Sequence, residues 1–118
     1  MSQENVSGIK TFVATTDLVA FRRVKLTAGG ATNVEYAGAG EAYIGYTAGD
    51  AKLGTPIGIA LKTTGRTFKA VAAEALAAGA SLYGAANGKV QDTLVGSAQA
   101  TALEAATADG DVIEILPV

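Results

Sequence analysis

The side chains that most often perform catalysis or bind metals are absent from this chain of 118 residues. It contains neither histidine nor cysteine, which removes the commonest acid/base group, the usual zinc ligands and every thiol nucleophile. The remaining carboxylates cluster at Asp109, Asp111 and Glu114. An EF-hand loop needs oxygen ligands at several fixed positions around a central glycine, and this segment has too few of them in the wrong order. We therefore expect a turn and a strand here, with no metal, no cofactor and no enzymatic activity.

Two further segments match parts of known binding motifs. Gly38-Ala39-Gly40 has the spacing of a phosphate-binding loop, but such a loop must open a helix, and the residues that follow, "EAYIGYT", have a strand pattern. Lys52 lies in a turn, "AGDAKLG", as does the modified lysine of biotinyl and lipoyl carrier domains. The order of its neighbours differs from the carrier motif, so an ordinary turn is the simpler interpretation.

The only basic cluster is formed by Arg22, Arg23 and Lys25. In an extended strand, Arg23 and Lys25 would share one face and Arg22 would lie on the other. Two interpretations stay open. The cluster could contact an acidic protein surface, or it could be a solvated strand whose charges prevent edge-to-edge aggregation.

Composition narrows the classes of partner. The formal net charge is −2, which argues against a general nucleic-acid-binding protein. Hydrophobic residues make up 49% of the chain, but much of this fraction is alanine and only 6% of residues are aromatic. The four tyrosines and three phenylalanines are therefore expected to hold a thin core together, although they could instead form a sugar-binding platform. We expect no membrane span, because no stretch of about 18 residues is uniformly apolar, and no signal peptide.

Short alternating runs between regularly spaced glycines predict a mainly β protein, a small compact β-sandwich or barrel-like domain with short helical turns. Residues 79–93 have the pattern of a hairpin with Asn87-Gly88 at its turn. Two alanine-rich segments, 71–78 and 98–108, favour helix instead. Residues 1–8 are polar and lack periodicity, so the prediction is an N-terminal arm followed by one domain over residues 9–118. The expected strands cover residues 9–14, 18–26, 33–37, 41–47, 56–62, 66–72 and 111–116.

Several turn and packing motifs resemble those of the small capsid decoration, or cement, proteins of tailed bacteriophages. The resemblance covers residues 54–118 well and residues 40–50 more loosely. The motifs in this sequence are Gly58-Ile59-Ala60, Ala78-Gly79-Ala80-Ser81-Leu82-Tyr83, Gly88-Lys89-Val90 and Gly110-Asp111-Val112-Ile113.

The resemblance implies a structural role in the virion. Such proteins bind the outside of the mature capsid, often as homotrimers, and cement neighbouring subunits of the major capsid protein against internal DNA pressure. The chain would be synthesised in the host cytoplasm and would bind neither nucleic acid nor membrane. A virion-surface module that binds glycans or host surfaces is the alternative.

Two sets of residues are the predicted capsid contacts. In the arm, Asn5, Val6 and Ser7, with Ile9 at the start of the first strand, could order on binding and add a strand to a capsid edge. The basic cluster, Arg22, Arg23 and Lys25, is the second possible contact.

Overall fold

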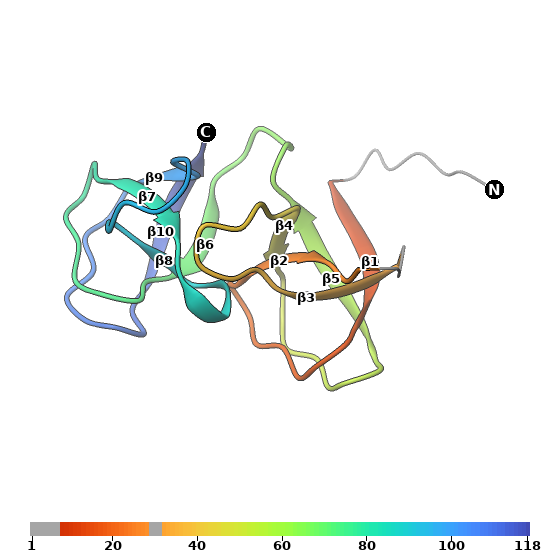
Figure 1. The fold of residues 1–118 in the computed structure, drawn as a ribbon. Coiled ribbons are helices and arrows are strands. Elements are labelled where there is room, and N and C mark those ends of the chain that lie inside the picture. The colour runs from red at the N-terminus through yellow and green to blue at the C-terminus, as the bar shows by residue number, and fades with distance from the viewer. Residues whose placement is uncertain (1–7, 29–31) are drawn as a thin grey trace.

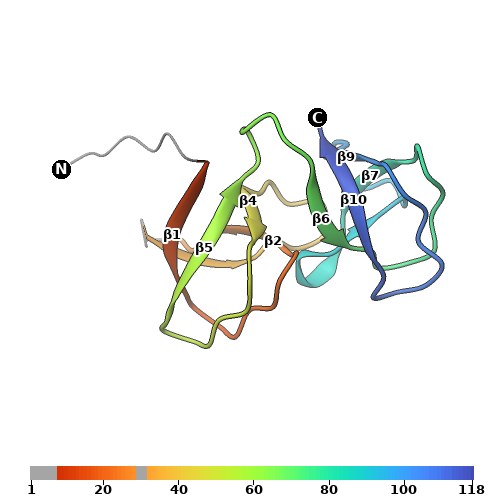
Figure 2. The same cartoon turned by 180° about the vertical axis from the view of Figure 1, so that it is seen from behind.

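The computed structural model describes residues 8–28 and 32–118, and in this part of the chain the fold is mainly β. Two lobes follow one another in sequence, a closed barrel and a second five-stranded sheet (Figures 1 and 2). The barrel strands are β1 (Ile9–Ala14), β2 (Arg23–Leu26), β3 (Asn33–Tyr36), β4 (Gly45–Thr47) and β5 (Pro56–Leu61). The second sheet contains β6 (Phe68–Val71), β7 (Ser81–Gly84), β8 (Val90–Gln91), β9 (Ala100–Ala102) and β10 (Val112–Pro117).

The barrel closes because β1 pairs along both of its edges. Its strand order is β1-β3-β2-β4-β5, with β5 returning to β1. β1 and β5 are antiparallel over five positions, from Ile9 opposite Ala60 to Val13 opposite Pro56. β1 and β3 are parallel. Inward-facing side chains alternate with outward-facing ones along β1 and β5, as strand geometry requires. Buried side chains of β1, β2, β3 and β5, together with Leu18, form the barrel core: Phe12, Ala14, Leu18, Val24, Val34, Ile57 and Ile59.

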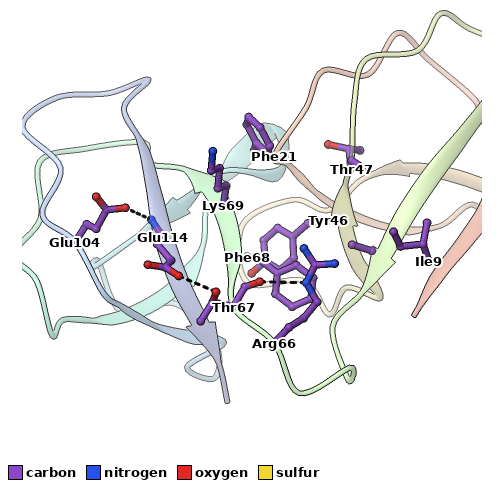
Figure 3. Close-up of a pocket in the computed structure, with 12 residues that line it drawn as sticks. Ile9, Phe21, Tyr46, Thr47, Arg66, Thr67, Phe68, Lys69, Glu104 and Glu114 are labelled. Atoms are coloured by element: carbon purple, nitrogen blue, oxygen red, sulfur yellow. Dashed lines mark hydrogen bonds between the residues drawn. The ribbon is translucent and has the colours of Figure 1, made fainter. Parts of the chain in front are cut away.

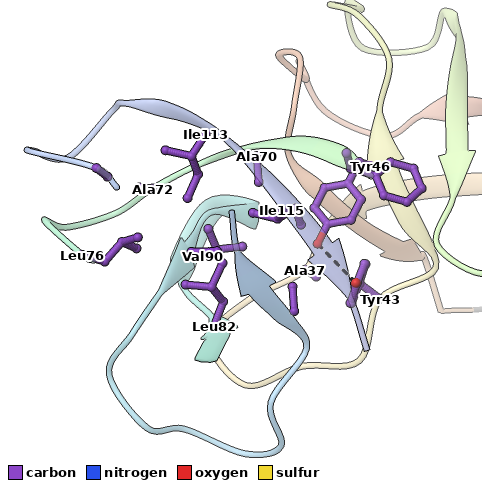
Figure 4. Packing of buried hydrophobic residues seen from close by; sticks show 14 of the residues in the cluster. Ala37, Tyr43, Tyr46, Ala70, Ala72, Leu76, Leu82, Val90, Ile113 and Ile115 are labelled. Carbon is purple, nitrogen blue, oxygen red and sulfur yellow. Dashed lines mark hydrogen bonds between the residues drawn. The ribbon is translucent and has the colours of Figure 1, made fainter. Parts of the chain in front are cut away.

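The second sheet has the order β6-β10-β9-β7-β8. An isolated bridge between Ala72 and Val90 brings the chain just after β6 close to β8. Its core, which we call the second-sheet core, also takes in residues from the barrel side, and Figure 4 shows Ala37, Tyr43 and Tyr46 packed against it. The two lobes therefore share apolar packing.

Most predicted strands are confirmed, with shifts at their ends. The strand expected over residues 18–26 begins only at Arg23, because Phe21 has a φ of 64°, a left-handed conformation that a strand does not accommodate. The predicted hairpin is confirmed. β7 and β8 pair through Tyr83 opposite Gln91, and the turn between them holds the short 3₁₀ helix η1 (Ala86–Gly88) with Asn87 at a φ of 58°.

The two predicted helices are wrong. Residues 98–108 contain β9, and residues 71–78 continue from β6 into a bridge between Leu76 and Ala106. Leu76, Ala102 and Ala106 are buried, so their small or apolar side chains serve sheet packing. Tertiary burial has overridden the intrinsic helix propensity of alanine.

Candidate functional site

The predicted basic cluster does not form one surface. Arg22 is half-buried, with its guanidinium over the ring of Tyr36 and one hydrogen bond to the carbonyl of Asn87. Arg23 is fully buried, with 0% of its surface exposed. Lys25 is paired with Glu41 at 2.6 Å. The expectation that Arg23 contacts a capsid is therefore wrong, since no part of its side chain reaches the surface.

Arg23 instead connects the two lobes. It projects from β2, and its three guanidinium nitrogens all donate hydrogen bonds, which matches the several donors of this side chain. Burial lowers the pKa of Arg23 from its usual value, while the surrounding carbonyls stabilise the charged form. The acceptors are the carbonyls of Lys89 (3.0 Å), Glu41 (3.4 Å), Ala37 (3.2 Å), Gly38 (3.0 Å) and Ala85 (2.7 Å) and the side-chain oxygen of Gln99 (3.3 Å).

Two glycines make room for this arginine. A Cβ atom at Gly84 would lie 2.8 Å from Arg23 Cζ, and one at Gly88 would lie 2.6 Å from the Arg23 carbonyl oxygen. Gly88 also has a φ of 73°. Gly84 at the end of β7 is therefore required by the close approach of Arg23, and Gly88 in the turn that follows by both this approach and turn geometry.

The Lys25–Glu41 pair sits at the edge of the same region. The Glu41 carboxylate also accepts a hydrogen bond from the backbone N–H of Gly38 at 2.6 Å. The hydrogen bond between the two side chains raises the pKa of Lys25 and lowers the pKa of Glu41. Both charges are thus engaged within the chain.

The predicted arm contacts fall mostly outside the described residues. Asn5, Val6 and Ser7 lie there, and their role stays a prediction. Ile9 begins β1, and 46% of its surface is exposed.

Ile9 also lines a feature that sequence reasoning missed, a cleft between the barrel and the second sheet. We call it the interlobe cleft, and its volume is about 560 Å³ (Figure 3). The barrel contributes one wall and β6 with its neighbour β10 contributes the other. Its lining residues are Ile9, Phe21, Tyr46, Thr47, Ala48, Ala60, Arg66, Thr67, Phe68, Lys69, Glu104 and Glu114.

The charged groups of the interlobe cleft differ in the contacts that they make within the chain. The Glu114 carboxylate accepts a hydrogen bond from Thr67 Oγ1 at 2.7 Å, and the Glu104 carboxylate accepts one from the Glu114 N–H at 2.7 Å. The Arg66 guanidinium lies 4.9 Å from the centroid of the Phe68 ring, and Lys69 Nζ lies 5.7 Å from that of Phe21. The signal in the sequence that could have indicated these cations is the run "RTFK", in which Arg66 and Lys69 flank Phe68. The structure shows that Phe68 is buried.

The aromatic side chains serve mainly as core. Tyr43, Tyr46 and Phe68 are buried and in contact: Tyr43 meets Tyr46 edge-to-face at 5.2 Å between ring centroids, and Tyr46 stacks on Phe68 at 5.1 Å. Phe12 is buried in the barrel. A sugar-binding platform built on these four rings would have no exposed faces to offer.

The other candidate motifs form local structure. The N–H of Glu41 donates to the carbonyl of Gly38, which closes a turn that leads into β4 and opens no helix. Asp111 accepts hydrogen bonds from the N–H and hydroxyl of Thr107 at 2.8 Å each. Across residues 8–28 and 32–118 there is no group of three or more acidic side chains placed to hold a metal ion, and no helix has the length and apolar character to cross a membrane.

The arrangement defines a two-lobed β fold with a cleft between the lobes. No model of a known protein family matches the chain, and no curated protein matches it. Among solved structures, the fold is similar to the crystal structure of the N base of head fiber gp8.5 in bacteriophage phi29. The TM-score is 0.80 over 93% of this chain and 92% of that chain, at 15% sequence identity. At this identity the match establishes the fold.

Proposed function

We propose that this chain is a structural protein of a phage virion that binds the outside of the mature capsid and cements neighbouring major capsid protein subunits. The observation that carries the proposal is the match of nearly the whole fold to the base of a phage head fiber. The sequence motifs that resemble capsid decoration proteins point independently to the same class.

The proposed mechanism is differential binding. A ligand that binds only the assembled shell stabilises it by about 2.7 kcal/mol per site when its concentration is 100 times its dissociation constant. The effect accumulates over the equivalent sites of a shell. As a homotrimer on the capsid, the protein would contact several subunits at once, and the linked contacts would raise its avidity.

The N-terminal arm is a proposed part of this interaction. Deletion of residues 1–8 is expected to weaken capsid binding and to leave the barrel folded, because the β1–β5 register starts at Ile9. Unchanged binding would remove the arm from the mechanism.

The test is cosedimentation with mature capsids of the cognate phage that lack this protein. We expect saturable binding in a fixed ratio to the major capsid protein and a gain in the resistance of the shell to heat. A folded protein that does not bind these capsids would overturn the proposal, and binding to glycans and host surfaces would then be measured.

A further inference from the structure

β6 is an edge strand of the second sheet, and one stretch of its outer edge makes no backbone pairing with the described residues. Within the described residues β6 pairs with β10 alone, with Lys69 opposite Glu114. The Glu114 carbonyl accepts from the N–H of Leu103 at 2.9 Å, and the Glu114 N–H donates to Glu104. Both backbone groups of Glu114 therefore face away from β6. Because hydrogen-bonded and non-hydrogen-bonded pairs alternate in an antiparallel ladder, the backbone N–H and C=O of Lys69 face away from β10.

The rest of this edge is occupied. The N–H of Val71 donates to the carbonyl of Phe21 at 3.2 Å, and the N–H of Ala73 donates to the carbonyl of Val90 at 2.8 Å. Lys69 comes two residues earlier, and it lines the interlobe cleft. The open part of the edge thus coincides with the cleft.

The cleft lies beside the open stretch of β6, between that strand and the barrel. Thr47, Ala48 and Ala60 of the barrel line the wall opposite β6, and the buried rings of Tyr46 and Phe68 stack on each other where the two walls meet (Figure 3). A strand added at β6 would lie about 4.8 Å from it. The volume of about 560 Å³ is in the range of ligand-binding clefts.

The two cations beside the open edge of β6 favour an acidic occupant. Arg66 and Lys69 are exposed, and neither belongs to an ion pair in the described part of the chain. The carboxylates of Glu104 and Glu114 keep their negative charge, but they lie on the β10 side of the cleft (Figure 3), where they accept hydrogen bonds from Thr67 Oγ1 and the Glu114 N–H. A lysine on an edge strand discourages pairing with unrelated strands, but it attracts a strand that carries a carboxylate.

We propose that an extended acidic segment of the capsid-side partner protein lies in the interlobe cleft and pairs with the backbone of Lys69 as an additional strand. Main-chain hydrogen bonds would supply affinity, and the two cations would supply specificity. The proposal rests on the proposed function, since it takes the capsid as the source of the segment.

The direct test is amide hydrogen exchange of the full chain, free and bound to capsids that lack it. The Lys69 amide is expected to exchange rapidly in the free protein and at least about tenfold more slowly on the capsid, because it gains a partner there. Protection of Lys69 in the free chain would overturn the proposal. It would assign the cleft to the chain's own arm if independent of concentration, and to a second copy if it rises with concentration.

Variants separate the backbone and charge contributions. Lys69→Pro and Lys69→Ala both remove the ammonium group, but only proline removes the N–H that faces the cleft, at an edge position where proline is tolerated. We expect Lys69→Pro to weaken capsid binding about tenfold more than Lys69→Ala. Lys69→Glu and Arg66→Glu are expected to weaken binding about tenfold or more, whereas the exposed control Lys52→Glu should bind as the wild type does.

The outcomes distinguish the two proposals. Wild-type binding with an unprotected Lys69 amide and unaffected charge-reversal variants would overturn the added strand and leave the capsid-binding function standing. Absence of wild-type binding would overturn both. If Lys69→Pro does not fold, the exchange of the wild-type amide and the two charge reversals decide the question.

Discussion

The barrel and the second sheet build their cores from different side chains. One of the seven residues in the barrel core is alanine, and the rest are large aliphatic or aromatic residues. In the second-sheet core, seven of fifteen residues are alanine, and two of its largest members, Tyr43 and Tyr46, come from the barrel side. Alanine buries little area per residue. The second sheet therefore depends on the barrel for part of its packing, whereas the barrel core is complete within β1–β5 and the adjoining Leu18.

Arg23 adds polar contacts to the apolar packing by which the second sheet depends on the barrel. It belongs to the barrel strand β2, yet three of its six acceptors, Ala85, Lys89 and Gln99, belong to the second sheet or its loops. A buried charge with a full set of acceptors specifies how two surfaces dock, although it adds less net stability than its bond count implies. We expect the docking of the second sheet to be the less stable part of the molecule.

The largest predicted effect is that of Arg23→Met, which leaves several buried carbonyls without a donor. Each unsatisfied buried group costs about 1–3 kcal/mol, so we expect a total loss above about 4 kcal/mol, measured by urea unfolding. Hydrogen exchange should show that amides of the second sheet lose protection before those of the barrel. The control Arg22→Met removes one partly exposed hydrogen bond and should cost less than about 1.5 kcal/mol. An Arg23→Met variant as stable as the wild type would contradict the inference that the second sheet depends on Arg23 for its docking on the barrel.

Gly84→Ala should have the next largest effect, a loss of about 1–3 kcal/mol. The new methyl group would displace the Arg23 guanidinium, which its hydrogen bonds hold in place. The matched control is Gly58→Ala in β5, where the Cβ would meet only Ile9 Cγ2 at 3.5 Å, and stability there should change by less than about 1 kcal/mol. Thermal unfolding of the pair is the measurement, and equal losses would argue against a clash with Arg23.

A smaller difference is expected between two fully buried isoleucines, Ile115 in the second-sheet core and Ile59 in the barrel core. Ile→Val costs about 0.5–1.5 kcal/mol, depending on how far the site can collapse. The alanine neighbours of Ile115, such as Ala102 across the strand pair, have no rotamers with which to fill the space. We expect Ile115→Val near the upper end and Ile59→Val near the lower end. A reversed order in denaturant unfolding would contradict the argument from core composition.

The smallest effect concerns alkaline pH. Burial raises the pKa of Tyr43 and of Tyr46, whereas the barrel core contains no titratable side chain. Unfolded tyrosines lose their proton near about pH 10, so the unfolded state binds fewer protons than the folded state above that pH. The contribution of the two phenols is complete below this pH and is lost above it. The urea midpoint should fall from about pH 9 to pH 11, and less steeply in Tyr43→Phe/Tyr46→Phe. If the urea midpoints of the wild type and the double variant fell in parallel with pH, the two buried phenols would not be the cause of the loss.

Sequence patterns predicted the strands better than the contacts between them. The alternation in residues 9–14, 33–37 and 56–62 identified three barrel strands, because burial on one face leaves a period of two. The alanine-rich segments were wrongly predicted as helices because alanine both favours helices and packs closely in sheets, and only the tertiary context distinguishes the two. The resulting β9 is three residues long, too short for any pattern to identify.

The candidate site was only partly predictable. The basic cluster was visible, but its members differ in burial because Phe21 interrupts the expected strand, and a single sequence does not reveal which cation turns inward. The interlobe cleft joins residues from Ile9 to Glu114, and such long-range proximity arises from the docking of two lobes. Gly88 was interpreted as a turn residue, and its close approach to the Arg23 backbone adds a reason that no local rule contains.

The pairing of β1 also has a mechanical consequence. β1 is matched to β5 at five positions and to β3 at two. Tension applied along this strand therefore loads its hydrogen bonds together, in shear, and they do not open one after another. Resistance to force follows the rate of unfolding rather than the equilibrium stability. A force applied at Ile9 therefore acts first on β1, a strand that is hydrogen-bonded along both of its edges.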